Sequence, residues 1–343
     1  MQLHDVWFVL IAFLWTGYFF LEGFDFGIGV LTRILARDAE ERGVLLATIG
    51  PVWDGNEVWM LTAVGATFAA FPDWYAILCS GFYLPLLALL VCLIVRGVAL
   101  EYRAKRDDGP WRRTCDRCVL WTSVGCAYLW GLVFANMVRG VPIGPDGNYT
   151  GTVLDLLNPY ALLGGCVTLC LFTLHGALFA ALKTTGSIRR RARELACRLT
   201  TPTAVAMLAF VLWTQIHRPE IPAFIVLTVG VGALFLVVEM TEKAKEGRAF
   251  ALSGLVVAAL VAGLFLDLFP DVMPSSSEPG WSLTVESAAS SPYTLTILTW
   301  VAAFGAPVVI AYQAWTYWVF RRRIGVTRGP GRAERAERAG THR

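Results

Sequence analysis

The chain has 343 residues, of which 56% are hydrophobic and only 16% are charged. A typical soluble domain carries about 25% charged residues, so this composition excludes an ordinary soluble protein and predicts an integral membrane protein. The formal net charge is a modest +3, but the places where the charges lie along the chain prove more informative than their sum.

Apolar stretches long enough to cross a bilayer, about 20 residues each, recur between charged or Pro/Gly-rich breaks. Each must be a helix, because lipid offers no partner for a free backbone N–H or C=O group. We therefore predict an all-α integral membrane protein with one transmembrane domain, residues 1–320, and a basic tail, residues 321–343. The nine predicted spans lie near residues 6–31, 52–71, 75–95, 118–138, 157–182, 199–216, 221–239, 249–268 and 294–320. The count depends on two short connections, residues 71–74 and 217–220.

The basic residues set the predicted orientation. If the nine spans alternate, 27 of the 29 Lys and Arg residues fall on one side, and only Arg139 and Arg218 fall on the other. Cytoplasmic loops hold the excess of Lys and Arg, so we expect the N-terminus outside and the C-terminus in the cytoplasm. The basic tail is then a solvated end beside anionic lipid, and we favour this over nucleic-acid binding.

Four acids lie inside the first two predicted spans, and ionisable groups inside a span usually have a function. Glu22 and Asp25 are three residues apart on the first span, so they share a helix face, and Asp54 and Glu57 repeat this spacing on the second. The predicted orientation places all four in the cytoplasmic half of the membrane. We interpret them as a proton or cation route.

A structural interpretation of the same acids stays open. They could cap helix N-termini or pair with Arg33 and Arg96. Asp54 in particular lies in the first turn after Pro51, where a carboxylate interacts favourably with the helix dipole. For Asp54 alone the two interpretations are equally good, whereas for the four acids together we favour proton transfer.

Metal or haem ligands are scarce. Of the four histidines only His175 lies well inside a span, and we expect it to be a packed, hydrogen-bonded residue. Cys115 and Cys118 form a single CxxC pair without the further ligands that zinc needs. We therefore predict no metal site and no catalytic group in this chain. Gly23 and Gly27 have the spacing that lets another helix approach closely.

Several motifs run in order from the first span to the last. They are Glu22-Gly-Phe-Asp-Phe-Gly-Ile-Gly29, Pro51-Val-Trp-Asp-Gly-Asn-Glu-Val-Trp59, Ser80-Gly-Phe-Tyr83, Asn158-Pro-Tyr-Ala-Leu-Leu-Gly164, Phe269-Pro-Asp-Val-Met-Pro-Ser-Ser276, Thr299-Trp300 and Trp315-Thr-Tyr-Trp318. In these motifs the chain resembles subunit II of the bacterial cytochrome bd quinol oxidases. The Trp-Asp-Gly-Asn element is the most specific of them.

The resemblance implies two four-helix bundles plus a peripheral helix, and a location in the bacterial cytoplasmic membrane. It also implies a partner, subunit I, that carries haem b, haem d and the quinol site. This chain would complete the fold and help to deliver cytoplasmic protons for the reduction of O2 to water. Asp25 and Asp54 match acids implicated in that route, whereas Glu22 and Glu57 stand where other members can carry Asp and Gln. The resemblance also allows a structural quinone and small accessory subunits.

Two other functions remain open at this point. One is a secondary transporter that couples a substrate to protons, although the early proline, Pro51, begins a span rather than interrupting one. The other is a scaffold in which the acids only hold the helices together. Assembly with a haem-bearing partner would distinguish the oxidase subunit from the transporter.

Overall fold

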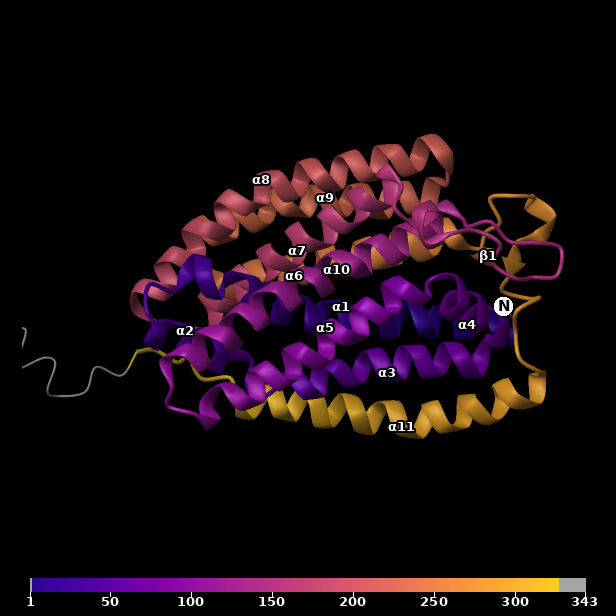
Figure 1. Ribbon diagram of the computed structural model, residues 1–343. Helices are drawn as coiled ribbons and strands as arrows, with labels where there is room; N and C mark the ends of the chain where they lie inside the picture. Colours follow the sequence, from indigo (N-terminus) through magenta and orange to yellow (C-terminus); the bar gives the residue numbers. More distant parts are fainter. Residues whose placement is uncertain (1, 327–343) are drawn as a thin grey trace, which may run out of the picture.

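The protein is a bundle of long helices that run alongside one another (Figure 1), and the computed structural model describes residues 2–326. Most of the predicted tail, residues 327–343, lies outside the described residues. The helices are α1 (Leu3–Leu35), α2 (Ala39–Ile49), α3 (Trp53–Ala70), α4 (Pro72–Gly81), α5 (Tyr83–Tyr102), α6 (Gly109–Arg139), α7 (Pro159–Lys183), α8 (Gly186–His217), α9 (Ile221–Glu242), α10 (Glu246–Leu268) and α11 (Pro292–Val319). One small antiparallel sheet pairs β1 (Asp271–Met273) with β2 (Leu283–Thr284).

The helices pack in two groups that meet at α1, α6 and α7. In the first group α3 and α6 contact α1, and α5 contacts α6; in the second α8 and α10 contact α7, and α9 contacts α8 and α10. Glycine allows the contact between the groups, because a Cβ on Gly27 of α1 would lie 2.0 Å from the backbone oxygen of Phe172 and 2.8 Å from the Cα of Gly176. The packing role predicted for Gly27 is confirmed.

Eight helices in the described part of the chain are long and apolar enough to cross a membrane: α1, α5 (with the turn to Lys105), α6, α7, α8, α9, α10 and α11. Of the nine predicted spans, the one without such a helix is 52–71, which corresponds to α3. It has 18 residues, but its first turns carry Asp54, Asn56 and Glu57 and make it more polar than the others. The two short connections do separate helices, at Phe71 and at residues 218–220.

The third span lies further along the chain than residues 75–95. A separate helix, α4, ends at Gly81, and the spanning helix α5 begins at Tyr83. Pro85 is the reason: it has no N–H to continue the ladder of α4, yet proline is tolerated in the first turn of a new helix. This shift corrects our assignment of Arg96, which we counted with the cytoplasmic loops. Arg96 lies inside α5 with an exposed fraction of 0%.

The connections gather at the two ends of the bundle as the alternation of spans predicts. At one end Val141 pairs with Ser275, and Arg218 Nη2 lies 3.2 Å from Asp271 Oδ2. At the other end, where α2 lies (Figure 1), Thr184 pairs with Ile324 and Arg191 Nη2 lies 2.6 Å from Glu41 Oε2. The basic end of the molecule is therefore tied together by contacts between segments far apart in sequence.

Candidate functional site: a buried cluster of acids

Three of the four predicted acids meet between α1, α3 and α5. Glu22 and Asp25 on α1 have exposed fractions of 0%, because the three-residue spacing turns both toward the neighbouring helices. Glu57 comes from α3, and its side chain is 24% exposed. We refer to Glu22, Asp25, Glu57 and the Arg96 that joins them as the acid cluster.

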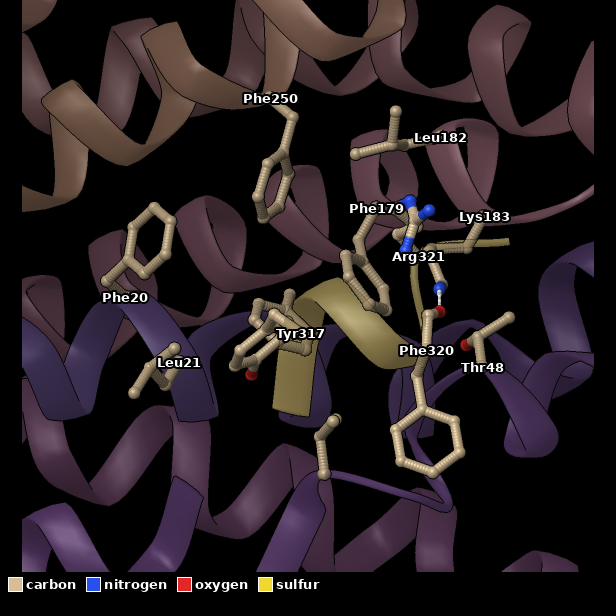
Figure 2. A pocket seen from close by; sticks show the side chains of 12 residues that line it. Phe20, Leu21, Thr48, Phe179, Leu182, Lys183, Phe250, Tyr317, Phe320 and Arg321 are labelled. Atoms are coloured by element: carbon tan, nitrogen blue, oxygen red, sulfur yellow. Dashed lines mark hydrogen bonds between the residues drawn. The ribbon is translucent and has the colours of Figure 1, made fainter. Parts of the chain in front are cut away.

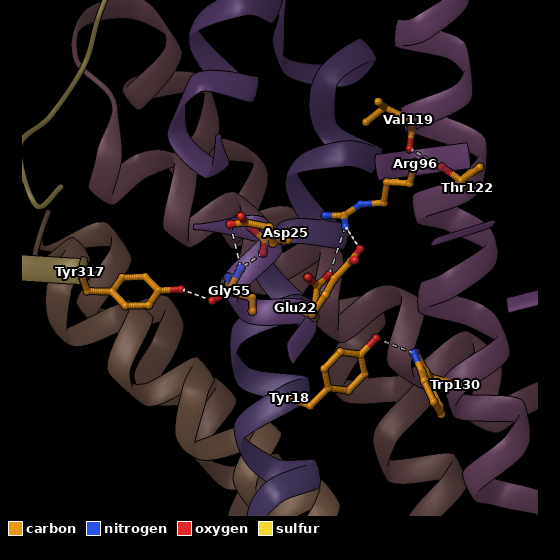
Figure 3. A network of polar contacts seen from close by, with 12 residues as sticks. Tyr18, Glu22, Asp25, Gly55, Arg96, Val119, Thr122, Trp130 and Tyr317 are labelled. Carbon is orange, nitrogen blue, oxygen red and sulfur yellow. Dashed lines mark hydrogen bonds and ion pairs between the residues drawn. The ribbon is translucent and has the colours of Figure 1, made fainter. Parts of the chain in front are cut away.

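Arg96 is the cation of the acid cluster. Its Nη1 lies 3.3 Å from Glu22 Oε2 and also 3.3 Å from Glu57 Oε1, and Figure 3 shows the guanidinium reaching toward the acids of α1. The guanidinium lies over the ring of Phe26, and the distance from Arg96 Cζ to the ring centroid is 4.9 Å. The pairing with Arg96 considered from the sequence is thus present for both glutamates.

Asp25 is bound by a different group, the amide of Asn56. The Nδ2 of Asn56 donates to Asp25 Oδ2 at 2.7 Å. Its Oδ1 accepts two hydrogen bonds from α11, one from Gln313 Nε2 at 2.9 Å and one from the Tyr317 hydroxyl at 2.8 Å. Asp25 is on α1, whereas Asn56 is on α3 and its two donors, Gln313 and Tyr317, are on α11.

The acid cluster contains three carboxyl groups and one guanidinium group. Both oxygens of Glu22, Oδ1 of Asp25, and Nε and Nη2 of Arg96 are buried without a hydrogen bond among the described residues. Three ionised carboxylates beside one guanidinium would leave two negative charges uncompensated, which is costly away from water. Protons on the carboxylates remove that cost, so the arrangement suits groups that take up and release protons.

Asp54 does not join the acid cluster. It lies in the first turn of α3, is exposed, and accepts a hydrogen bond from the adjacent backbone N–H of Gly55 at 2.8 Å. It therefore lies on the outward face of α3, while Asn56 and Glu57 face inward. The alternative placement of Asp54 at a helix N-terminus agrees with this position.

A pocket of about 320 Å3 lies beside the acid cluster, between α1, α7, α10 and the end of α11. Figure 2 shows its wall of aromatic rings, among them Phe20, Phe179 and Phe250. Lys183 and Arg321 also line it. Tyr317 connects the pocket with the surroundings of Asp25: its ring lines the pocket, and its hydroxyl donates to Asn56.

His175 is fully buried in α7, and both ring nitrogens have partners. Nδ1 lies 2.7 Å from Ser253 Oγ, Nε2 lies 3.1 Å from the backbone oxygen of Phe20, and the ring stacks on Phe250 at 4.5 Å. These contacts confirm the packed role predicted for His175. Among residues 2–326 no group of three or more His, Cys, Asp or Glu side chains is placed to hold a metal ion.

Sequence reasoning missed several members of the site. Asn56 could have been found, because it stands between Asp54 and Glu57 in a polar stretch of an otherwise apolar helix. Gln313 and Tyr317 are 257 and 261 residues from Asn56, and nothing near them signals the contact. A further buried acid, Asp267 of α10, was also missed; both its oxygens lack a partner among the described residues.

Comparison with known proteins gives consistent matches over nearly the whole chain. The family model described as cytochrome bd terminal oxidase subunit II matches residues 3–320. Cytochrome bd ubiquinol oxidase subunit 2 of Bacillus subtilis (strain 168) is 41% identical over 331 residues, 94% of this chain and 97% of the relative. Cytochrome bd-I ubiquinol oxidase subunit 2 of Escherichia coli (strain K12) is 33% identical over 360 residues, covering 94% and 95%. In fold, a chain of the bd oxidase from Geobacillus thermodenitrificans matches with a TM-score of 0.74 at 16% identity, over 93% of this chain and 99% of that one.

Proposed function

Because the chain belongs to the cytochrome bd terminal oxidase subunit II family, it is a subunit of a membrane-bound quinol oxidase, and we propose that its own part in the reaction is to hold and pass on protons. The observation that carries the proposal is the acid cluster, in which buried carboxylate oxygens lack partners beside a single guanidinium. Family membership replaces the transporter hypothesis.

The acid cluster supplies the chemistry that a proton relay needs. Reduction of dioxygen to water consumes protons as well as electrons. Oδ1 of Asp25 and both oxygens of Glu22 have no hydrogen-bond partner among the described residues and can accept a proton, while Arg96 stabilises the negative charge that remains when a proton leaves Glu22 or Glu57. Asp54, exposed on the outer face of α3, is the proposed entry group, and Glu22, Asp25 and Glu57 continue the route.

The haems belong, in this proposal, to the partner subunit I. The family implies haem in the complex, but the described part of this chain offers poor axial ligands. His175 uses both ring nitrogens in hydrogen bonds, and a haem iron would need one of them free. In this proposal haem b, haem d and the quinol-oxidation site therefore lie in subunit I, and this chain passes protons to that subunit. Small accessory subunits are compatible with this assembly.

The proposed membrane arrangement has nine spans, with α3 as the ninth. Its last turn reaches the end of the bundle where Ser290 N–H donates to Ala70 O at 2.8 Å. Of the polar residues that distinguish α3 from a lipid-facing helix, Asn56 is buried against Asp25 of α1 and Glu57 pairs with Arg96 of α5. The two groups of packed helices correspond to the two four-helix bundles, and α11 is the peripheral helix. The proposed orientation has the N-terminus outside and the C-terminus in the cytoplasm of a bacterial cell, and the concentration of basic residues at one end supports it.

A structural quinone, if this subunit holds one, fits a second pocket of about 550 Å3 at the end opposite α2. Tyr160 and Trp213 offer aromatic walls, and Arg139 and Arg218 offer donors for the two carbonyl oxygens of a quinone. Mass spectrometry of organic extracts from the purified complex tests the assignment. An Arg218→Ala variant should lose a quinone that the unaltered complex retains.

The relay is tested by Asp25→Asn in the assembled oxidase. We expect oxygen consumption to fall about tenfold or more, the scale on which acid–base groups act, with an unchanged haem spectrum. Asp267→Asn is the matched control, since it removes another buried acid with unpaired oxygens outside the acid cluster. Normal turnover in the Asp25 variant, or an equal loss in both variants, would contradict the proposal.

A further inference from the structure

Helix α11 touches the rest of the molecule lightly, except at one polar point. In the apolar window of this helix only 6% of the residues are buried, and the buried residues of α11 are Leu295 and Gln313. A buried glutamine on a helix that otherwise faces outward needs a reason, because an unpaired amide inside the membrane is costly. Its partner is Asn56, beside Asp25.

The two hydrogen bonds from α11 determine which way round the Asn56 amide lies. Gln313 Nε2 and the Tyr317 hydroxyl are both donors here, and both are directed at Oδ1 of Asn56. The oxygen of the amide therefore faces α11. Its NH2 group faces α1, where it donates to Asp25 Oδ2 at 2.7 Å. With the amide reversed, its oxygen would face the carboxylate, and Gln313 and Tyr317 would have to accept from Nδ2 instead of donating.

From this geometry we propose that Gln313 and Tyr317 are positioning residues for proton transfer. They hold the Asn56 amide so that it donates to Oδ2 of Asp25, and Oδ1 of Asp25 is then the one oxygen of that carboxylate left free to accept a proton. The inference rests on the proposed relay through Asp25. It gives the peripheral helix a part in the reaction, although α11 carries no acid that faces the acid cluster.

The surroundings of Asp25 show how the amide affects its titration. The charged and titratable groups that act on it electrostatically are Glu22 on α1, Glu57 and the outward-facing Asp54 on α3, Arg96 on α5 and Tyr317 on α11. Against these fixed neighbours, a hydrogen bond donated by Asn56 favours the ionised carboxylate. Losing that bond favours the protonated form, so that Asp25 takes up a proton readily but releases it slowly.

The test compares Tyr317→Phe with Tyr312→Phe in the complete oxidase. Both changes remove one hydroxyl from α11, but Tyr312 is 60% exposed and Tyr317 donates to Asn56. We expect Tyr317→Phe to slow oxygen consumption about threefold to tenfold, the rate equivalent of one hydrogen bond, and to shift the pH–rate profile toward higher pH. The haem spectrum and subunit ratio should not change. Gln313→Met should act in the same direction, and Tyr312→Phe should leave both rate and profile unchanged.

A second comparison shows whether the effect passes through Asn56. In an Asn56→Leu background, Tyr317→Phe should cause no further loss, because the group that it positions is gone. If Asp25→Asn slows the enzyme while the α11 variants keep a normal rate and pH profile, the positioning role is wrong and the relay stands. If Asp25→Asn itself has no effect, the proposed relay fails, and the positioning role fails with it. Equal losses from the Tyr317 and Tyr312 variants would assign the tyrosine a merely structural role.

Discussion

At the scale of single residues, the site is organised by one arginine. Arg96 has an exposed fraction of 0% and lies 3.3 Å from oxygens of both Glu22 and Glu57. A buried ion pair contributes little by itself, but removal of one partner leaves the other charge without compensation. Arg96 therefore makes it possible to bury several acids together, an arrangement compatible with both the scaffold and the proton-relay interpretations of the sequence.

We expect Arg96→Met to destabilise the subunit by about 3–5 kcal/mol and to prevent assembly of a normal complex. The yield and thermal stability of the purified oxidase measure this. Arg190→Met is the matched control, because the Arg190 side chain is 75% exposed and pairs only with Glu194 at 4.0 Å among the described ion pairs. Normal assembly of the Arg96 variant would show that the acids are held in place without the guanidinium.

At the scale of helices, α1 forms the centre of the fold because small residues let its neighbours approach. The predicted close contact occurs at Gly27, where a Cβ would lie 2.0 Å from a backbone oxygen of α7. A backbone atom cannot rotate away as a side chain can. Glu22 and Asp25 lie on this same helix, so the geometry of the acid cluster depends on the close packing of α1.

Gly27→Ala is expected to destabilise the protein by about 1–3 kcal/mol, the usual cost of overpacking. Gly65→Ala provides the contrast: nothing lies within 4 Å of a Cβ at that position on α3, and alanine favours a helix over glycine by about 1 kcal/mol. Melting temperatures of the two purified variants should move in opposite directions. A similar stability for both would show that the backbones of α1 and α7 separate easily.

The short helix α2 is held by a carboxylate outside the spans. Glu41 accepts hydrogen bonds from Arg191 Nη2 at 2.6 Å, the Arg37 backbone N–H at 2.7 Å and Ser187 Oγ at 3.2 Å. Although burial acts in the opposite direction, these bonds and the charge of Arg191 hold the pKa of Glu41 below its ordinary value of 4.5. The folded state therefore favours the ionised form of Glu41.

The sign of the pH effect follows from this lowered pKa. The stabilisation from Glu41 is fully present above pH 4.5 and is lost as the pH falls through the lower pKa of the folded state. Melting curves of the complex should therefore show Glu41→Gln less stable than the unaltered protein near neutral pH, with the difference vanishing in acid. A difference that persists at the lowest pH would mean that Glu41 acts through packing alone.

At the scale of the whole molecule, a large apolar surface of this chain lacks a protein neighbour in the structure. Outward-facing residues of α3 and α5, among them Leu61, Phe68, Leu87 and Ile94, are 41–64% exposed. Lipid or the partner subunit can cover such a surface. Asp54 lies on the same outward side of α3.

Production of this chain with and without its partner tests the assembly. We expect the chain alone to carry no haem absorbance and the co-produced pair to purify together with the haem spectrum of the complex. Haem retained by the isolated subunit in stoichiometric amount would overturn the assignment of both haems to subunit I.

The sequence by itself determined the class of the protein, the alternation of its connections and the acids to examine. These follow from local physics: lipid requires helices, cytoplasmic loops collect basic residues, and a charged group inside a span needs a reason to be there. Family motifs that run from the first span to the last added the function. The start of α5 was misjudged because apolar content alone does not show where Pro85 ends one helix and allows the next.

Only the tertiary structure decided which groups serve these acids. The contacts of Arg96, Asn56, Gln313 and Tyr317 join four helices across as many as 261 residues of chain, and no periodicity in the sequence encodes a partner at that distance. The three-residue spacing put Asp54 and Glu57 on one helix face, but α3 turns Asp54 outward and Glu57 toward Arg96. Local chemistry determined which residues could carry protons, and packing determined which of them face one another.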